Sequence, residues 1–160
     1  MKKILFVFSL FFLSITSLNA ETKRIVSGND NARITIIAYE SLTCSHCANF
    51  HRDVYPLLKK DYIDTGLAKI EFRHFPLDNA AFNASKIAQC KQDQSLEILE
   101  SLYSNQQSWV KGNSIEEVNN NLKNFLKNEG FELDFEKCIN NKKIEDFVLN
   151  DRIEGTKNFK

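Results

Sequence analysis

A pair of cysteines at the junction of a predicted strand and a predicted helix constrains this chain more than any other feature. The apolar run Ile34–Tyr39 predicts the strand, and the segment from Cys44 onward predicts an amphipathic helix. Cys44 and Cys47 enclose Ser45 and His46. The first sulfur would lie at a helix N-terminus, where unpaired N–H groups and the helix dipole favour a thiolate. The second would lie one turn further on, close enough to close a disulfide. This setting is typical of thiol–disulfide exchange centres.

The segments around the cysteines predict a small sheet. The helix is expected to end near Asp64, with a kink at Pro56. Residues 68–75 then alternate apolar and polar side chains, as in a strand. Strand, helix and strand in this order predict a parallel βαβ unit. Residues 24–26 suit a short edge strand, and Ile34–Tyr39, apolar on both faces, suits a strand covered on both sides. The expected apolar stripe of the helix is Phe50, Val54, Leu57, Leu58 and Tyr62.

Several helices are expected after Pro76. Residues 80–91 are rich in Ala, and residues 96–103 carry another apolar stripe. Ser114 and Glu117 have the spacing of a capping box, and Gly130 is a stop signal for the helix that follows. Asp134 is expected to cap one last helix that runs through Val148.

The first 20 residues have the pattern of a secretory signal peptide. Lys2 and Lys3 precede an uncharged apolar run, and Ala20 suits the last position before cleavage. An uncleaved N-terminal anchor is the alternative, since Leu18 is larger than the residue preferred before a cleavage site. We therefore expect a signal peptide over residues 1–20 and one domain over residues 21–160. Export would permit stable disulfides, and it favours redox chemistry over a cytosolic zinc site.

The charge balance and the other two cysteines further restrict which partners and which kinds of site the sequence favours. The chain has 21 basic and 21 acidic residues, so no basic surface points to a nucleic-acid partner. Cys90 and Cys138 stand alone on two predicted helices, and export favours a structural disulfide between them over two buried free thiols. A metal site recruiting Cys44, Cys47 and His51 is a weaker alternative, because closed zinc sites usually show a second paired motif. No metal is expected.

The stretch from Tyr39 to His51, Tyr-Glu-Ser-Leu-Thr-Cys-Ser-His-Cys-Ala-Asn-Phe-His, resembles the active-site region of DsbA-like thiol–disulfide oxidoreductases of the thioredoxin superfamily. The stretch Phe72–Asp78 resembles a later segment of the same branch. The resemblance implies an α/β fold, a thioredoxin-like βαβ unit with a helical insertion over about residues 80–152. It also implies that Cys44 is the exposed nucleophile, Cys47 the resolving thiol, and His46 a residue that favours the reduced form of a strong oxidant. No bound cofactor is implied.

Two departures from the family pattern qualify this reading. Members often carry an acidic proton acceptor six residues before the first cysteine, where this chain has Ala38. Glu40 lies two residues later on the same strand face, so it either replaces that acid or is solvated at the strand end. The family also places a cis-proline loop, a β-hairpin and a last helix after the insertion. Neither Pro56 nor Pro76 can be that proline, so these elements are expected to be missing.

These observations lead to one main functional hypothesis and two alternatives. The main one is an exported, periplasmic enzyme that forms disulfides in reduced, unfolded secreted proteins and is reoxidised by a DsbB-like membrane partner. The reductase or isomerase direction stays open. A truncated, weakly active remnant of such an enzyme is the first alternative, and a metal-carrying thioredoxin-like module is the second. An unpaired edge of the Ile34–Tyr39 strand would favour low stability or self-association.

Overall fold

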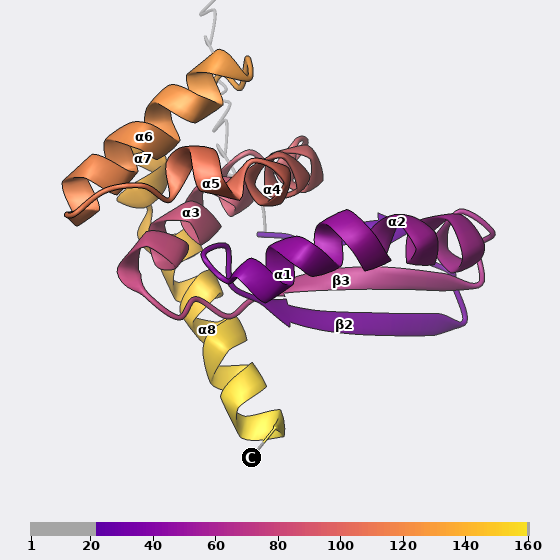
Figure 1. The fold of residues 1–160 in the computed structure, drawn as a ribbon. Helices are drawn as coiled ribbons and strands as arrows, with labels where there is room; N and C mark the ends of the chain where they lie inside the picture. Colours follow the sequence, from indigo (N-terminus) through magenta and orange to yellow (C-terminus); the bar gives the residue numbers. More distant parts are fainter. Residues whose placement is uncertain (1–21, 160) are drawn as a thin grey trace, which may run out of the picture.

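The computed structural model describes residues 22–159, which form a three-stranded sheet and a set of helices (Figure 1). The strands are β1 (Ile25–Gly28), β2 (Ile34–Glu40) and β3 (Ala68–His74), in the order β1-β3-β2. β3 pairs with β1 antiparallel and with β2 parallel, so the predicted parallel βαβ unit is confirmed. The predicted signal peptide lies outside the described residues.

The helix that connects β2 and β3 contains two π-helical segments. It runs through α1 (Ser45–Asn49), η1 (Phe50–Val54), α2 (Tyr55–Leu58) and η2 (Lys59–Ile63). Pro56 lies in the first turn of α2, directly after η1. A π-helical turn widens the hydrogen-bonding step to i→i+5, which changes the residues that face the sheet. Figure 1 shows this helix lying along β2 and β3.

The predicted apolar stripe of this helix is only partly confirmed, since Phe50 and Leu58 pack against the core and the other three residues do not. Val54, Leu57 and Tyr62 are at least half exposed, whereas His51 and Tyr55 are buried against the sheet. The π-helical turns account for part of the difference between the predicted and the observed buried face of the helix. His51 accounts for the remaining difference. A hydrophobic pattern counts this polar residue as exposed, but in this fold it is buried with Glu40 as its hydrogen-bonding partner.

The second half of the chain is helical. It contains α3 (Asn79–Cys90), α4 (Ser95–Ser104), α5 (Gln106–Trp109), α6 (Ile115–Asn128), α7 (Phe135–Ile139) and α8 (Lys142–Asn158). Ser114 caps α6 as predicted, by accepting a hydrogen bond from the Glu117 N–H at 3.2 Å. The single last helix is a wrong prediction. Asn141 starts a new helix there, because its side chain accepts bonds from the N–H groups of Lys143 and Ile144.

Helix α8 is fixed to the sheet by buried polar contacts. The Asp151 carboxylate is 1% exposed, forms an ion pair with Arg24, and accepts a hydrogen bond of 3.1 Å from the backbone N–H of His74. Gly155 allows close approach at the same face, since a Cβ atom there would lie 2.7 Å from the Tyr39 ring. These contacts hold α8 across one end of the sheet (Figure 1).

Strand β2 lies at the edge of the sheet. It pairs only with β3 among the described strands, and Ile34 and Ile37 are 55% and 45% exposed. The expectation that both of its faces are covered is therefore wrong for the described chain. Helices α1 and α2 cover one face, whereas α8 reaches only the end near Tyr39 on the other (Figure 1). In residues 22–159 no helix is long and apolar enough to span a bilayer.

Candidate active site

The two cysteines of the motif lie at the start of α1, as expected for an exchange centre. Cys44 is the N-cap residue of α1, with extended backbone angles, and its carbonyl accepts a hydrogen bond of 3.1 Å from the Ala48 N–H. Cys47 lies within the first turns of the helix. Both are half-buried free thiols, and Ser45 and His46 between them are exposed. His46 therefore faces solvent, and Cys47 packs against the hydrophobic core.

The loop before Cys44 is held from both sides. The hydroxyl of Thr43 donates a hydrogen bond of 2.7 Å to Asp78, whose other carboxylate oxygen caps α3 by accepting from the Ala81 N–H. The side-chain amide of Gln106, at the start of α5, donates to the carbonyls of Leu42 and Cys44 at 2.8 and 3.1 Å. Contacts from two remote helices thereby fix the backbone on which the first thiol stands.

The environment of Cys47 keeps its thiol protonated. Burial raises the pKa of Cys47 to about 11, and the negative charges of Cys44 and Glu40 act in the same direction. A hydrogen bond from the backbone of Ser41 opposes the shift. Cys47 is therefore a poor nucleophile at neutral pH unless a nearby base accepts its proton.

Glu40 supplies a buried carboxylate at the end of β2. It ends β2, is 9% exposed, and its Oε2 lies 2.7 Å from Nε2 of His51. The His51 ring stacks on Tyr103 of α4 at 4.0 Å between ring centroids. Burial raises the pKa of Tyr103 well above its usual value, and the charges of Glu40 and Cys47 add to the shift. Glu40 is thus not solvated at the strand end, and it lies close enough to influence both Cys47 and Tyr103.

A polar groove runs beside the first turn of α1. It has a volume of about 360 Å³ and lies between Ser45, Asn49 and Arg52 of the first helix and the 103–108 segment that joins α4 to α5. The groove borders Ser45, the residue that follows Cys44 in the chain.

The described residues contain no group of three or more His, Cys, Asp or Glu side chains arranged to hold a metal ion. His51 directs its Nε2 at Glu40 instead of joining the two cysteines in a shared site. His74 is buried in β3 with its Nε2 atom 3.1 Å from the Gln89 side chain, and burial lowers its pKa. Its contacts are those of a packed strand residue.

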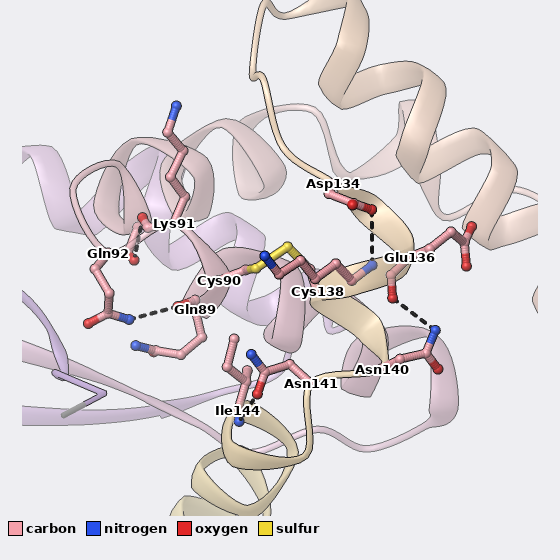
Figure 2. The surroundings of a disulfide bond; sticks show 12 residues. Gln89, Cys90, Lys91, Gln92, Asp134, Glu136, Cys138, Asn140, Asn141 and Ile144 are labelled. Carbon is pink, nitrogen blue, oxygen red and sulfur yellow. Dashed lines mark hydrogen bonds between the residues drawn. A yellow bond between two sulfur atoms is a disulfide. The ribbon is translucent and has the colours of Figure 1, made fainter. Parts of the chain in front are cut away.

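Cys90 and Cys138 form a disulfide between the end of α3 and α7, with a Cα–Cα distance of 5.5 Å (Figure 2). The bridge spans 48 positions of sequence. Asp134 starts α7 by accepting from the Lys137 N–H. Figure 2 places this disulfide within the helical region, among side chains of α3, α7 and the start of α8, so it links helices of the second half of the chain.

Three contributors to the site were not among the predicted site residues. His51, Tyr103 and Gln106 come from different helices, and only the fold brings them to the cysteines. A signal existed for His51, because a residue four positions after Cys47 shares its helix face. Glu40 projects from the strand face that this helix covers, and the structure places its carboxylate 2.7 Å from Nε2 of His51. No local pattern marks Tyr103 or Gln106.

Comparison with known proteins places these features in a family context. A family model described as Thioredoxin matches residues 20–159. A Rickettsia typhi protein whose name assigns it to the protein-disulfide oxidoreductases is 28% identical over 127 residues, which are 78% of this chain and 46% of the relative. A Rickettsia conorii protein of the same name is 30% identical over 74% of this chain and 43% of its own length. The chain thus spans about half the length of these relatives.

Solved structures show the same likeness. The crystal structure of alpha-DsbA1 from Wolbachia pipientis matches with a TM-score of 0.74 and 34% identity, over 88% of this chain and 69% of that chain. BdbD from Bacillus subtilis, in its oxidised form, matches with a TM-score of 0.68 and 21% identity, over 84% and 75% of the two chains. Because BdbD is only 21% identical to this chain, the similarity between the two shows a shared fold alone.

Proposed function

The chain belongs to the thioredoxin family, and we propose that it is an exported protein-disulfide oxidoreductase that forms disulfides by exchange at Cys44 and Cys47. The observation that carries this proposal is the placement of the two thiols. Cys44 stands at the N-terminus of α1, while Cys47 lies half-buried against the hydrophobic core. The DsbA-like fold and the names of the relatives support the same reaction class.

The proposed reaction starts from the Cys44–Cys47 disulfide. A substrate thiolate attacks the sulfur of Cys44, the S–S bond breaks, and its electron pair leaves on Cys47, which takes a proton. The second substrate thiol then loses its proton and attacks the substrate sulfur of the mixed disulfide. The bond between the substrate sulfur and Cys44 breaks, its electron pair leaves on Cys44, and the substrate departs oxidised while the cysteine pair is left reduced. The high pKa of Cys47 favours its protonation in the first step.

The direction and the location are part of the same proposal. The exposed His46 beside a helix-terminal thiolate favours the reduced pair, and a stable reduced pair makes the disulfide an oxidant. Reduced secreted proteins in the periplasm are the proposed substrates, and a DsbB-like membrane protein the proposed reoxidant. The polar groove beside Ser45 is suited to an extended chain, and the N-terminal segment is the proposed export signal.

A peptide-oxidation assay tests the proposal. The full chain, exported and oxidised, is mixed with a reduced dithiol peptide in a glutathione redox buffer, and disulfide formation is followed by mass spectrometry. Catalysis by the wild type and its loss in Cys44→Ala would support the proposal. Equal rates for wild type and Cys44→Ala would contradict it and favour the inactive remnant.

Self-association through β2 is a second part of the proposal. The unpaired edge of β2 is long, and Ile34 and Ile37 on it are exposed, which favours pairing with a second strand. Sedimentation velocity over a range of protein concentrations should show a dimer that Ile37→Lys weakens. Leu57→Lys is the matched control, because Leu57 is 62% exposed on the helix, away from the strand edge. A monomer at every concentration would contradict this part.

A further inference from the structure

The polar groove beside Ser45 is lined by side-chain amides on both of its walls. Asn49 belongs to the first helix, and Asn105, Gln106 and Gln107 come from the junction of α4 and α5. The first helix and α4 lie side by side, which brings these residues together (Figure 1). A carboxamide both donates and accepts hydrogen bonds, so this carboxamide groove offers both kinds of partner along one channel.

Gln106 connects the carboxamide groove to the first cysteine. Its side-chain nitrogen donates hydrogen bonds to the carbonyl oxygens of Leu42 and Cys44, at 2.8 and 3.1 Å. Because a carbonyl oxygen only accepts hydrogen bonds, these contacts fix which end of the amide is the nitrogen. Within residues 22–159 the Oε1 atom of Gln106 has no partner, so it is left as an acceptor. A ligand that donates to this oxygen is one side chain away from the residue that carries the exchanging sulfur.

The other amides keep most of their hydrogen-bonding capacity. Asn105 donates from Nδ2 to the Ser101 carbonyl at 3.1 Å, and no described residue donates to its Oδ1. The side chains of Asn49 and Gln107 are exposed and form no hydrogen bond within the part of the chain that the structure describes. These uncommitted donors and acceptors favour a ligand whose own polar groups are of both kinds.

The charge of the groove does not favour an ionic ligand. Arg52 is the one charged side chain among the described residues that line it. The guanidinium of Arg52 already donates two hydrogen bonds to the Asp53 carboxylate, at 2.8 and 2.7 Å. An anion would have to compete with this carboxylate, so the groove suits a neutral polar ligand.

An extended peptide main chain has the matching chemistry and size. Its N–H and C=O groups point to both of its sides, where a strand would pair with its neighbours. A reduced, unfolded protein has these groups free, because no secondary structure uses them. From Ser45 to Arg52 the helix wall rises about 10 Å, which is the length of about three extended residues.

We propose that the carboxamide groove binds the main chain of the residues beside the substrate cysteine while that cysteine reacts with Cys44. This inference rests on the proposed exchange function and assigns it a substrate subsite. Main-chain hydrogen bonds supply affinity without selecting side chains, so the subsite accepts unfolded proteins of many sequences. The exchange chemistry is unchanged, and the groove raises its rate by holding the substrate thiolate near Cys44.

Quenched-flow kinetics on the full, oxidised chain tests the inference. Reduction of the Cys44–Cys47 disulfide is compared for a reduced dithiol peptide and for dithiothreitol, which has no peptide group. A double variant, Asn49→Leu with Gln107→Met, removes two amides at nearly constant size. One hydrogen bond is worth about 5-fold in rate, so this variant should react about 25-fold more slowly with the peptide. Its rate with dithiothreitol should equal that of the wild type.

A second measurement uses the unchanged protein and therefore does not depend on the folding of a variant. A set of peptides carries one ester in place of one amide at each position near the cysteine, which removes a single N–H donor and keeps every side chain. At least one ester should slow the wild type about 5-fold and leave the double variant unaffected. Exchanging the neighbouring side chains among Ala, Val and Lys should change the wild-type rate less than that ester does.

The matched control is Asn124→Leu, which removes an exposed amide of α6 outside the groove. It should react like the wild type with both reductants. A wild type that reacts with neither reductant would contradict the exchange function itself. The subsite alone would be overturned by a double variant that keeps the wild-type rate with the peptide or slows equally with both reductants. Ester peptides that all react with the wild type as fast as their parent would overturn it as well.

Discussion

Oε2 of Glu40 and Nε2 of His51 lie 2.7 Å apart, with both side chains buried between β2, the first helix and α4. This contact joins the end of a strand to the helix that carries both redox cysteines. It also contributes to stability, because His51 would otherwise be buried without any hydrogen-bond partner.

Removing the carboxylate should destabilise the fold. Glu40→Ala leaves both nitrogens of His51 unpaired, which should lower the free energy of unfolding by about 1–3 kcal/mol. Glu40→Gln keeps an acceptor for Nε2–H and should recover most of this loss. Urea unfolding followed by circular dichroism measures both. Equal midpoints for Glu40→Ala and wild type would show that the contact does not stabilise the fold.

The reactivity of Cys47 should depend strongly on pH. Burial is the largest cause of the raised pKa of Cys47 and remains in a Cys44→Ser variant, so the thiol should stay mostly protonated at pH 7 and iodoacetamide should label it slowly. The rate should climb as pH approaches 11. Since the native pKa exceeds that of the unfolded thiol, this group contributes stability that is complete below about pH 9 and is lost as pH rises toward 11. Labelling that levels off near pH 8 would refute the raised pKa.

The attachment of α8 should depend on one buried carboxylate. Asp151→Ala removes the partner of both Arg24 and the His74 N–H, at a cost of about 3 kcal/mol in unfolding free energy. Glu154→Ala is the matched control one turn further on, since Glu154 is 43% exposed and its ion pairs should contribute less than about 1 kcal/mol. Chemical denaturation compares the two, and equal losses would contradict the assigned role of Asp151.

The strand, helix and strand around the cysteines could be predicted because their signals are local. Alternation marks β3, and Ser114 marks the start of α6 through a single cap. The buried face of the first helix could not be predicted, because π-helical turns shift the pattern and His51 counts as polar in any hydrophobic period.

Other parts of the site depend on contacts distant in sequence. The bond from Gln106 to the Cys44 carbonyl spans 62 positions and that from Thr43 to Asp78 spans 35, and neither follows from periodicity. Glu40 was predicted as one of two alternatives, because the sequence does not show whether a strand end is covered. The break at Asn141 was missed, since residues 135–148 carry apolar side chains on both sides of it.

The second cysteine pair should stabilise the helical half without affecting exchange. Replacing both Cys90 and Cys138 by Ser opens a loop of 48 positions, which should cost about 4 kcal/mol by the chain-entropy relation. Peptide oxidation by the folded variant should match the wild type. Urea midpoints and initial rates measure the two effects. An unchanged midpoint together with lost activity would contradict a purely structural role.

The central claim is that Cys44 is the sulfur that exchanges with a partner and Cys47 is its internal disulfide partner, and trapping the mixed disulfide tests it most directly. Cys47→Ser and Cys44→Ser, each in the full exported chain, are reduced and mixed with oxidised glutathione at pH 7, and adducts are located by peptide mass mapping. The structure predicts a stable glutathione adduct on Cys44 of Cys47→Ser, at the helix N-terminus, and little adduct on Cys47 of Cys44→Ser, because burial raises the pKa of Cys47. Equal adducts on the two cysteines, or an adduct on Cys47 alone, would contradict the claim.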